Sequence, residues 1–435
     1  MDIYNLVSFA GIFVLLAIAW ALSRFVFKNT RKMNWHLLGW ALGLQLIFAL
    51  FIFVIPAGVI LFQAINDLAV TVLGTASAGA QFVFGSLALA PGVQGSLGFI
   101  LAFQAFPTIV FFSALVAVLY YYNVLPFIIR QFAWLFTRVM RISGAEALCA
   151  ASNIFVGVES AFTIKPHIDK MTRSELCTIL TAGMATVASN VLALYVFTLQ
   201  TQFPSIAGHL ISASFLSAPA ALVMSKLILP ETGIPQTLGR VVDIHYERDA
   251  NLFEAIINGS ASGLKVIFSI VALLIAVMGL VALVDLILGS TAGMVNQWMG
   301  TSMDWSLKLL LGYIFYPFTL IIGIPLADAG IISRIIGERI ILTEVASYQD
   351  LALALAQNSL THPRSAVVAA YALCGFAHVA SMAIFVGGIS ALAPKQTAAI
   401  SGVAVKALIA ATFACLMTAC VAGTFYTNNS LLLGN

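Results

Sequence analysis

Long apolar stretches separated by short polar connections run along the whole chain, and this pattern predicts membrane-spanning helices. A helix that crosses a bilayer needs about 20 consecutive, mostly apolar residues. Eight stretches meet this requirement: 4–26, 35–62, 99–122, 174–200, 207–229, 261–289, 365–391 and 398–425. Two further segments, 64–90 and 125–140, are expected at the membrane surface as interfacial helices. We therefore predict an all-α polytopic membrane protein with about eight transmembrane helices.

Two other apolar stretches, 143–170 and 309–343, are interrupted in the middle by glycine, proline or charge. The interruptions are Gly157-Val158-Glu159-Ser160 in the first and Gly323-Ile324-Pro325 through Asp328 in the second. Each half is too short to cross a bilayer alone. Backbone that leaves the helical conformation inside a membrane is tolerated only where protein or a water-filled cavity satisfies its polar groups. The pattern therefore predicts two re-entrant hairpins.

The distribution of charge orients these elements. If the N-terminus lies outside, most of the 20 Lys and Arg residues fall in cytoplasmic loops, as the positive-inside rule requires. The opposite loops then carry Asp2, Asp67, Asp285 and Asp304. Eight spans place both termini outside, and the two hairpins enter from opposite sides of the membrane.

A weak internal repeat supports this arrangement. Thr172-Arg173-Ser174-Glu175 opens one long helix, and Pro363-Arg364-Ser365-Ala366 opens another. At the same offset, Ala188-Ser189-Asn190 and Val379-Ala380-Ser381 place a small polar interruption inside each helix. A hairpin followed by a broken helix, repeated in inverted orientation, is how many secondary transporters build a site near the bilayer midplane.

Composition excludes several classes of protein. The chain is 61% hydrophobic and 9% charged, whereas about 25% of the residues in a soluble domain are charged, so its partner is the lipid bilayer. No Lys or Arg cluster is interleaved with aromatic residues, which argues against nucleic acid. The five cysteines lie in apolar runs without metal-ligand spacing. Motifs of hydrolases, zinc proteases and P-loop ATPases are absent, which favours a transporter driven by an ion gradient over an enzyme.

Several segments together resemble the concentrative nucleoside transporter family. They are Asn153-Ile154-Phe155-Val156-Gly157, Lys165-Pro166 through Leu176, Gly323-Ile324-Pro325 with Asp328-Ala329, Tyr371 through Ala377, and Ala393-Pro394-Lys395. The resemblance covers about 81–423 and implies a homotrimer in which a scaffold surrounds a mobile transport domain. It divides the chain into scaffold helices one to three with interfacial helices (1–140), the first hairpin with transport helices four and five (141–230), a cytoplasmic loop with scaffold helix six (231–304), and the second hairpin with helices seven and eight (305–435).

The resemblance also implies a sodium site. Its ligands would be Asn153 and Val156 in the first hairpin, and Thr186 and Val187 at the break of the fourth helix. Side-chain oxygens and freed carbonyl oxygens suit a hard cation at such a break. In the alternative interpretation Asn153 and Thr186 only cap broken helix ends, and a proton replaces sodium as the coupling ion.

Substrate contacts carried over from the family fall on nine positions, several with altered residues. They are Val158, Glu159, Ser160, Val191, Ala327, Asp328, Phe376, His378 and Ser381. The family's Gly-Gln-Ser/Thr-Glu-Ala-Pro tip reads Gly157-Val158-Glu159-Ser160-Ala161-Phe162, Ala327 stands for the glutamate of the second tip, and His378 stands for a ribose-binding asparagine. The family's Asn-Glu-Phe signature becomes Thr343-Glu344-Val345. These departures predict weak binding of ordinary nucleosides.

For some of these residues a purely structural role is the alternative. Glu159 and Asp328 could cap half-helices through the N-terminal dipole, and His378 and Phe376 could be packed core side chains. A carboxylate inside the membrane is nevertheless a functional hypothesis by default.

The sequence therefore predicts a secondary active symporter of the inner membrane that imports a nucleoside or nucleoside-like solute with sodium or protons. One alternative is a proton-coupled transporter of a non-nucleoside solute on the same fold. A membrane sensor without transport is the other, and the retention of Glu159 and Asn153 argues against it.

Overall fold

The computed structural model describes residues 2–31, 33–90, 92–187, 189–246, 248–299 and 305–427, without the side chains of residues 158, 189, 190, 291, 293–295, 298 and 299. Asp304 and Ala188 therefore lie outside the described residues, as do the side chains of Val158, Ser189 and Asn190. Within the described ranges every named element is a helix, and the predicted all-α class is confirmed. Seven of the described helices are long and apolar enough to cross a membrane, and the shorter helices below pair into hairpins and broken spans.

The first third of the chain holds six helices: α1 (Ile3–Ala21), α2 (Trp35–Phe53), α3 (Pro56–Phe84), α4 (Leu101–Gln104), α5 (Phe106–Tyr121) and α6 (Val124–Met140). The boundary predicted between the span 35–62 and the interfacial segment 64–90 was wrong, because the helices separate earlier, between Phe53 and Pro56. Pro56 has no backbone N–H to donate and is favoured at the start of a helix; α2 ends at Phe53 and α3 begins at Pro56. The segment Pro56–Ala88 is itself long and apolar enough to cross a membrane.

Both predicted hairpins have a break where the glycines stand. The first consists of α7 (Gly144–Ser152), an irregular tip, a 3-10 turn (Val158–Ile164) and α8 (Lys165–Ile168). The second consists of α13 (Leu307–Ile321) and α14 (Leu326–Glu338), followed by α15 (Glu344–Ala356). Gly323 at the second break has φ +84°, a left-handed conformation that glycine adopts without strain.

Each hairpin is followed by a broken helix. After the first come α9 (Arg173–Ala185) and α10 (Ser189–Leu199), and after the second come α16 (Pro363–Leu373) and α17 (Val379–Leu392). The predicted spans 174–200 and 365–391 are thus two half-helices each. Side chains cap two of these half-helices: His378 and Ser381 form a capping box on α17 at the break, and Thr172 and Glu175 form one at the outer start of α9.

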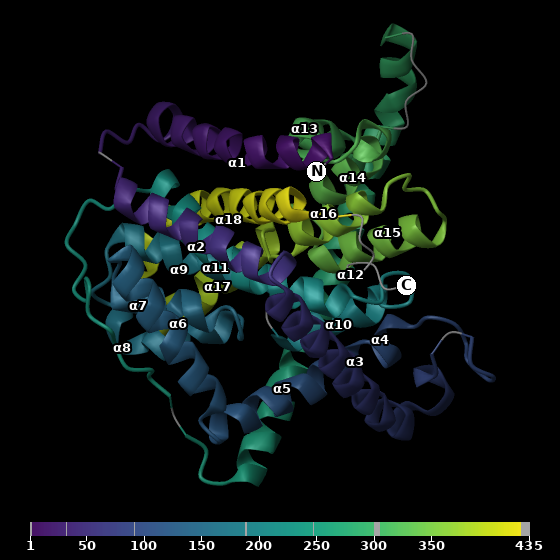
Figure 1. The fold of residues 1–435 in the computed structure, drawn as a ribbon. Helices are drawn as coiled ribbons and strands as arrows, with labels where there is room; N and C mark the ends of the chain where they lie inside the picture. The colour runs from purple at the N-terminus through teal and green to yellow at the C-terminus, as the bar shows by residue number, and fades with distance from the viewer. Residues whose placement is uncertain are drawn as a thin grey trace.

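Burial separates central from peripheral helices. The spans formed by α11 (Ile206–Ile228) and α18 (Thr397–Phe425) are mostly buried and lie in the middle of the molecule (Figure 1). In contrast, α12 (Leu252–Met299) exposes apolar side chains such as Phe268 and Ile275. Because exposure of such a large apolar surface to water is unfavourable, the outer helices face lipid. The half-helices α9 and α16 pack on α11 and α18, so both breaks lie in the protein interior.

Candidate functional site

Five of the predicted substrate residues line one cavity of about 240 Å³: Glu159, Val191, Phe376, His378 and Ser381. The first hairpin contributes Glu159, α10 contributes Val191, the break before α17 contributes Phe376 and His378, and the first turn of α17 contributes Ser381. The remaining walls come from α12 and from the Thr343-Glu344-Val345 segment. Residues more than 200 positions apart therefore line the same cavity, because the tip of the first hairpin faces the break between α16 and α17.

His378 forms the centre of a buried polar network in this cavity. Its Nδ1 accepts a hydrogen bond from the backbone N–H of Ser381 at 3.1 Å, and its Nε2 lies 2.9 Å from Glu344 Oε2. Tyr195 donates its hydroxyl to Glu344 Oε1 at 2.6 Å. A nitrogen that accepts a hydrogen bond carries no proton, so Nδ1 is unprotonated and the N–H at Nε2 faces the carboxylate. His378 thus holds Glu344 in place while it caps α17.

Glu344 is a functional candidate that sequence reasoning noted only as a changed motif. Its carboxylate is 4% exposed, stands at the start of α15 and lines the same cavity as Glu159. The signal was available, because an acidic residue in an apolar membrane segment is a candidate by its cost alone. What the pattern lacked was the partner, since Tyr195 is 149 positions away.

Ser381 and Phe376 shape the break itself. Ser381 Oγ donates to the backbone carbonyls of Phe376 and, at 2.8 Å, of His378. The Phe376 ring is partly buried in the cavity wall. A flat aromatic surface beside two carboxylates suits a solute that has a planar ring and hydroxyl groups.

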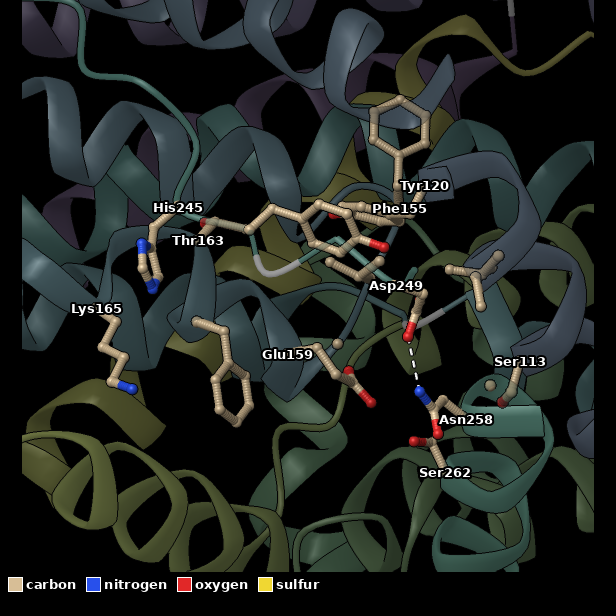
Figure 2. A pocket seen from close by; sticks show the side chains of 17 residues that line it. Ser113, Tyr120, Phe155, Glu159, Thr163, Lys165, His245, Asp249, Asn258 and Ser262 are labelled. Atoms are coloured by element: carbon tan, nitrogen blue, oxygen red, sulfur yellow. Dashed lines mark hydrogen bonds between the residues drawn. The ribbon is translucent and has the colours of Figure 1, made fainter. Parts of the chain in front are cut away.

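Glu159 separates this cavity from a second one of about 410 Å³. The larger cavity lies between α5, the first hairpin, the 229–251 connection and the start of α12, and Glu159 projects into it (Figure 2). On one side Asn258 Nδ2 donates to Asp249 Oδ1 at 2.7 Å. Tyr120 and Tyr246 line the cavity, with ring centroids 5.0 Å apart. One carboxylate therefore reaches both spaces, as expected of a residue on a solute path.

Comparison with known proteins agrees with this geometry. Three family models match: "Na+ dependent nucleoside transporter N-terminus" over residues 10–87, "Nucleoside recognition" over 102–202 and "Na+ dependent nucleoside transporter C-terminus" over 209–423. The nucleoside permease NupC of Helicobacter pylori is 34% identical over 98% of this chain and 99% of its own length. The chain belongs to the concentrative nucleoside transporter family.

Other family members extend the comparison. Solute carrier family 28 member 3 of Rattus norvegicus is 35% identical over 96% of this chain, which spans 58% of that protein's length. The solved structure of CNTnw in an inward-facing substrate-bound state is 32% identical, with a TM-score of 0.86 over 97% of this chain and 98% of the other. The polytopic membrane fold is therefore that of the family.

Two substrate residues carried over from the family do not reach either cavity. Asp328 Oδ1 accepts from Thr361 N at 2.8 Å, and its Oδ2 accepts from His362 N at 3.0 Å and from Ser365 Oγ at 2.5 Å. It caps the start of α16, where free N–H groups attract a carboxylate. Its neighbour Ala327 is exposed on α14. Asp328 takes the capping role of the structural alternative, and the acidic side chain of the second repeat that lines the cavity is Glu344; contact of Asp328 and Ala327 with substrate stays a prediction.

Within the first hairpin, the predicted substrate contact of Ser160 also stays a prediction. It is buried against Cys149, with its Oγ 3.7 Å from the sulfur, and is not part of either cavity wall. The side chain of Val158 lies outside the described residues.

The four predicted sodium ligands lie in a buried region where α7 and α9 pack together. Asn153 Nδ2 donates to Cys149 O at 3.0 Å, but Asn153 Oδ1 is buried and has no hydrogen-bond partner among the described residues. Thr186 Oγ1 donates to Ala182 O at 2.9 Å, which leaves its lone pairs available. A buried, unpaired amide oxygen beside a broken helix end fits a hard cation.

Proposed function

We propose that this chain is a secondary active symporter that imports a nucleoside or a closely related solute across the inner membrane with a coupling cation. The observation that carries the proposal is the cavity in which Glu159, Glu344, His378 and Phe376 meet at two opposed breaks. The relatives named nucleoside permease and sodium/nucleoside cotransporter support the substrate class. They do not favour the alternative of a non-nucleoside solute.

Recognition follows from the chemistry of the cavity walls. Glu159 and Glu344 are hydrogen-bond acceptors for sugar hydroxyls, and Phe376 offers a face on which a planar base can pack. A hydroxyl that is missing from the solute leaves a buried acceptor unpaired, at a cost of about 1–3 kcal/mol. The site should therefore distinguish a nucleoside from a free base.

Sodium is the proposed coupling cation, with Asn153, Val156, Thr186 and Val187 as the residues that would hold it. Bound there, sodium would supply the positive charge that the unpaired Asn153 Oδ1 and the end of α9 lack. Asn153 caps α7 in the hairpin and Thr186 caps α9, so a cation held by both residues would tie the hairpin that carries Glu159 to α9. A proton carried by Glu159 is the alternative.

The assembly and orientation belong to the same proposal. Residues 1–140 together with α12 form a scaffold, and the hairpins with the broken helices form the moving unit. The apolar surface of α12 and the family fold favour a homotrimer with both termini outside.

Thermal unfolding of the purified chain with uridine, adenosine, their free bases and unrelated metabolites tests the substrate class. A true ligand raises the stability by RT ln(1 + [L]/Kd). Nucleosides should stabilise the protein and free bases should not, with a larger effect in sodium than in choline buffer. Stabilisation only by a metabolite without a sugar would contradict the proposal. Equal effects in the two salts would contradict sodium coupling alone.

A further inference from the structure

Arg339 is the largest side chain that is completely buried among the described residues. It directly follows α14 as its C-terminal cap residue. Its Nη1 donates to the carbonyl oxygen of Ala372, the thiol of Cys415 lies beside the guanidinium, and its Nε and Nη2 have no nitrogen or oxygen partner in the described part of the chain. None of the ion pairs between described residues includes it. Since a guanidinium is always charged, a permanent cation is buried here without a paired anion.

The guanidinium meets the broken end of α16. This half-helix ends at Leu373 in the protein interior, and the last carbonyl groups of a helix lack intrahelical partners and carry negative partial charge. Two side chains from the neighbouring α14–α15 region reach them: Tyr348 donates its hydroxyl to Ala370 O at 2.9 Å, and Arg339 donates to Ala372 O. These helices lie together in Figure 1. The end of α16 is thus satisfied by a cation that is part of the chain.

In the first repeat, no charged side chain among the described residues donates to the corresponding helix end. The half-helix α9 also ends in the interior, at Ala185, but the side chains that donate to its last carbonyls among the described residues are neutral. Thr186 Oγ1 donates to Ala182 O at 2.9 Å, and Cys415 Sγ lies 3.8 Å from Ala185 O. At the end of α7, which packs on α9, Asn153 Oδ1 is an acceptor without a donor among the described residues. Among the described residues, one break holds an acceptor without a donor, and the other holds a cation that has a carbonyl acceptor but no paired anion.

We propose that Arg339 is a built-in cation of the second repeat, a positioning residue that takes at the end of α16 the place that a bound cation takes at the end of α9. The chain would then bind one coupling cation where two equivalent repeats would bind two. The role of Arg339 in holding the end of α16 does not depend on the identity of the substrate. The comparison with a bound cation rests on the proposed function.

The position of Arg339 connects this role to the substrate cavity. The turn that follows it leads to Glu344, and within this turn Ile340 O accepts the backbone N–H of Val379 at 3.0 Å. Val379 begins α17 directly after His378. By fixing α14 against α16, the guanidinium therefore holds Glu344 and His378 in register with each other.

The test is thermal unfolding of the purified full chain without solute, over a range of sodium concentrations at constant ionic strength with choline. The variants are Arg339→Lys, which keeps a cation, Arg339→Met, which keeps the length without charge, and Arg339→Ala, which opens space. Arg334→Met is the matched control, because Arg334 is exposed on the same helix. Asn153→Ala reports on the first repeat.

We expect Arg339→Lys and Arg334→Met to keep a Tm close to that of the unmodified chain, and Arg339→Met to lose roughly 5 °C or more. In Arg339→Ala a free cation can enter, so the slope of Tm against the logarithm of sodium concentration should rise by one ion, which doubles it if the unmodified chain binds one. If Arg339→Met does not fold, Arg339→Lys must still fold.

Three results would overturn the proposal: a Tm for Arg339→Met equal to that of the unmodified chain, equal losses in the Lys and Met variants, or an unchanged sodium slope in Arg339→Ala. Failure of the proposed sodium coupling gives a different pattern. The unmodified chain would then show no sodium slope and Asn153→Ala would change nothing, while Lys and Met at position 339 would still differ.

Discussion

The two hairpins have the same plan, yet their tips are embedded in the protein in opposite ways. The first tip carries Glu159 between two cavities, while its neighbours Ser160 and Thr163 are buried. The second tip, around Gly323, is held by Arg364, and its acidic residue Asp328 is fully used as a cap on α16. The first tip thus presents its carboxylate to two cavities, while the acidic residue of the second hairpin is used for capping and its tip is held by Arg364. The two copies of the repeat can therefore have different roles, with one hairpin lining the cavity and the other stabilising the surrounding helices.

Removal of Arg364 should have the largest effect on this comparison. Its guanidinium donates to five acceptors that join the second tip to α1 and α18: Gly323 O, Asn5 Oδ1, Tyr4 O, Ser8 Oγ and Gly423 O. Its counterpart in the first repeat, Arg173, is exposed. Arg364→Ala should lower the free energy of unfolding by more than about 3 kcal/mol, because several buried acceptors lose their donor. Arg173→Ala should change it by less than about 0.5 kcal/mol.

Chemical denaturation of both variants in the same detergent measures this difference. Similar losses in the two variants would show that the second tip is not braced through Arg364.

The contrast between the hairpins also shows what sequence reasoning could reach. Both breaks were predictable, because Gly157, Gly323 and Pro325 interrupt apolar runs that are too long to be loops. The split between α2 and α3 lies at Pro56, but the hydrophobic pattern continued across it and concealed it, and Pro219 and Pro317 show that a proline alone does not end a helix in this chain. Five residues of the cavity were also found through the family pattern.

The direction of a side chain at a break was not predictable. Asp328 turns to Thr361 and Ser365, which lie more than 30 positions further along the chain. Glu344 is recruited by Tyr195 and His378, which lie on either side of it in sequence. A carboxylate at a half-helix end has several possible partners, and the packing of distant helices decides among them.

The second prediction compares two acidic residues of the second repeat, Glu344 in the cavity wall and Asp328 at the start of α16. Glu344→Gln removes a charged acceptor from the cavity, so nucleoside affinity should fall by about 1–3 kcal/mol, roughly 5- to 150-fold. Asp328→Asn should weaken the cap on α16 and cost about 1 kcal/mol of stability without a comparable change in affinity. Calorimetric titration and thermal unfolding of both variants separate the two effects. An affinity loss for Asp328→Asn as large as that for Glu344→Gln would return Asp328 to the substrate site.

The third prediction concerns the unpaired acceptor of the first repeat. Sodium at 100 times its Kd should stabilise the unmodified chain by about 2.7 kcal/mol. Asn153→Ala should abolish this dependence, because it removes the buried Oδ1 that has no donor among the described residues. The measurement is the Tm in sodium and in choline at equal ionic strength, with Arg173→Ala as a control. If Asn153→Ala retained the full sodium effect, the coupling cation would have to bind elsewhere.

The smallest expected effect is at His378, where capping and recognition meet in one side chain. Asparagine caps helices well, so Asn in place of His378 can still accept the Ser381 N–H, and stability should change by less than about 1 kcal/mol. Its amide is shorter than the imidazole whose Nε2 lies 2.9 Å from Glu344, so Glu344 should be released from this contact.

An acceptor freed in this way is available to a sugar hydroxyl, and His378→Asn should therefore raise the affinity for uridine or adenosine, by a few-fold if one hydrogen bond of about 1 kcal/mol is gained. Ala327→Glu is the matched control, because an acidic residue on the exposed side of α14 lies outside both cavities and should leave affinity unchanged. Titration calorimetry on both variants decides between the assignments. Tighter binding by Ala327→Glu and weaker binding by His378→Asn would mean that the second tip, and not the break before α17, reads the sugar.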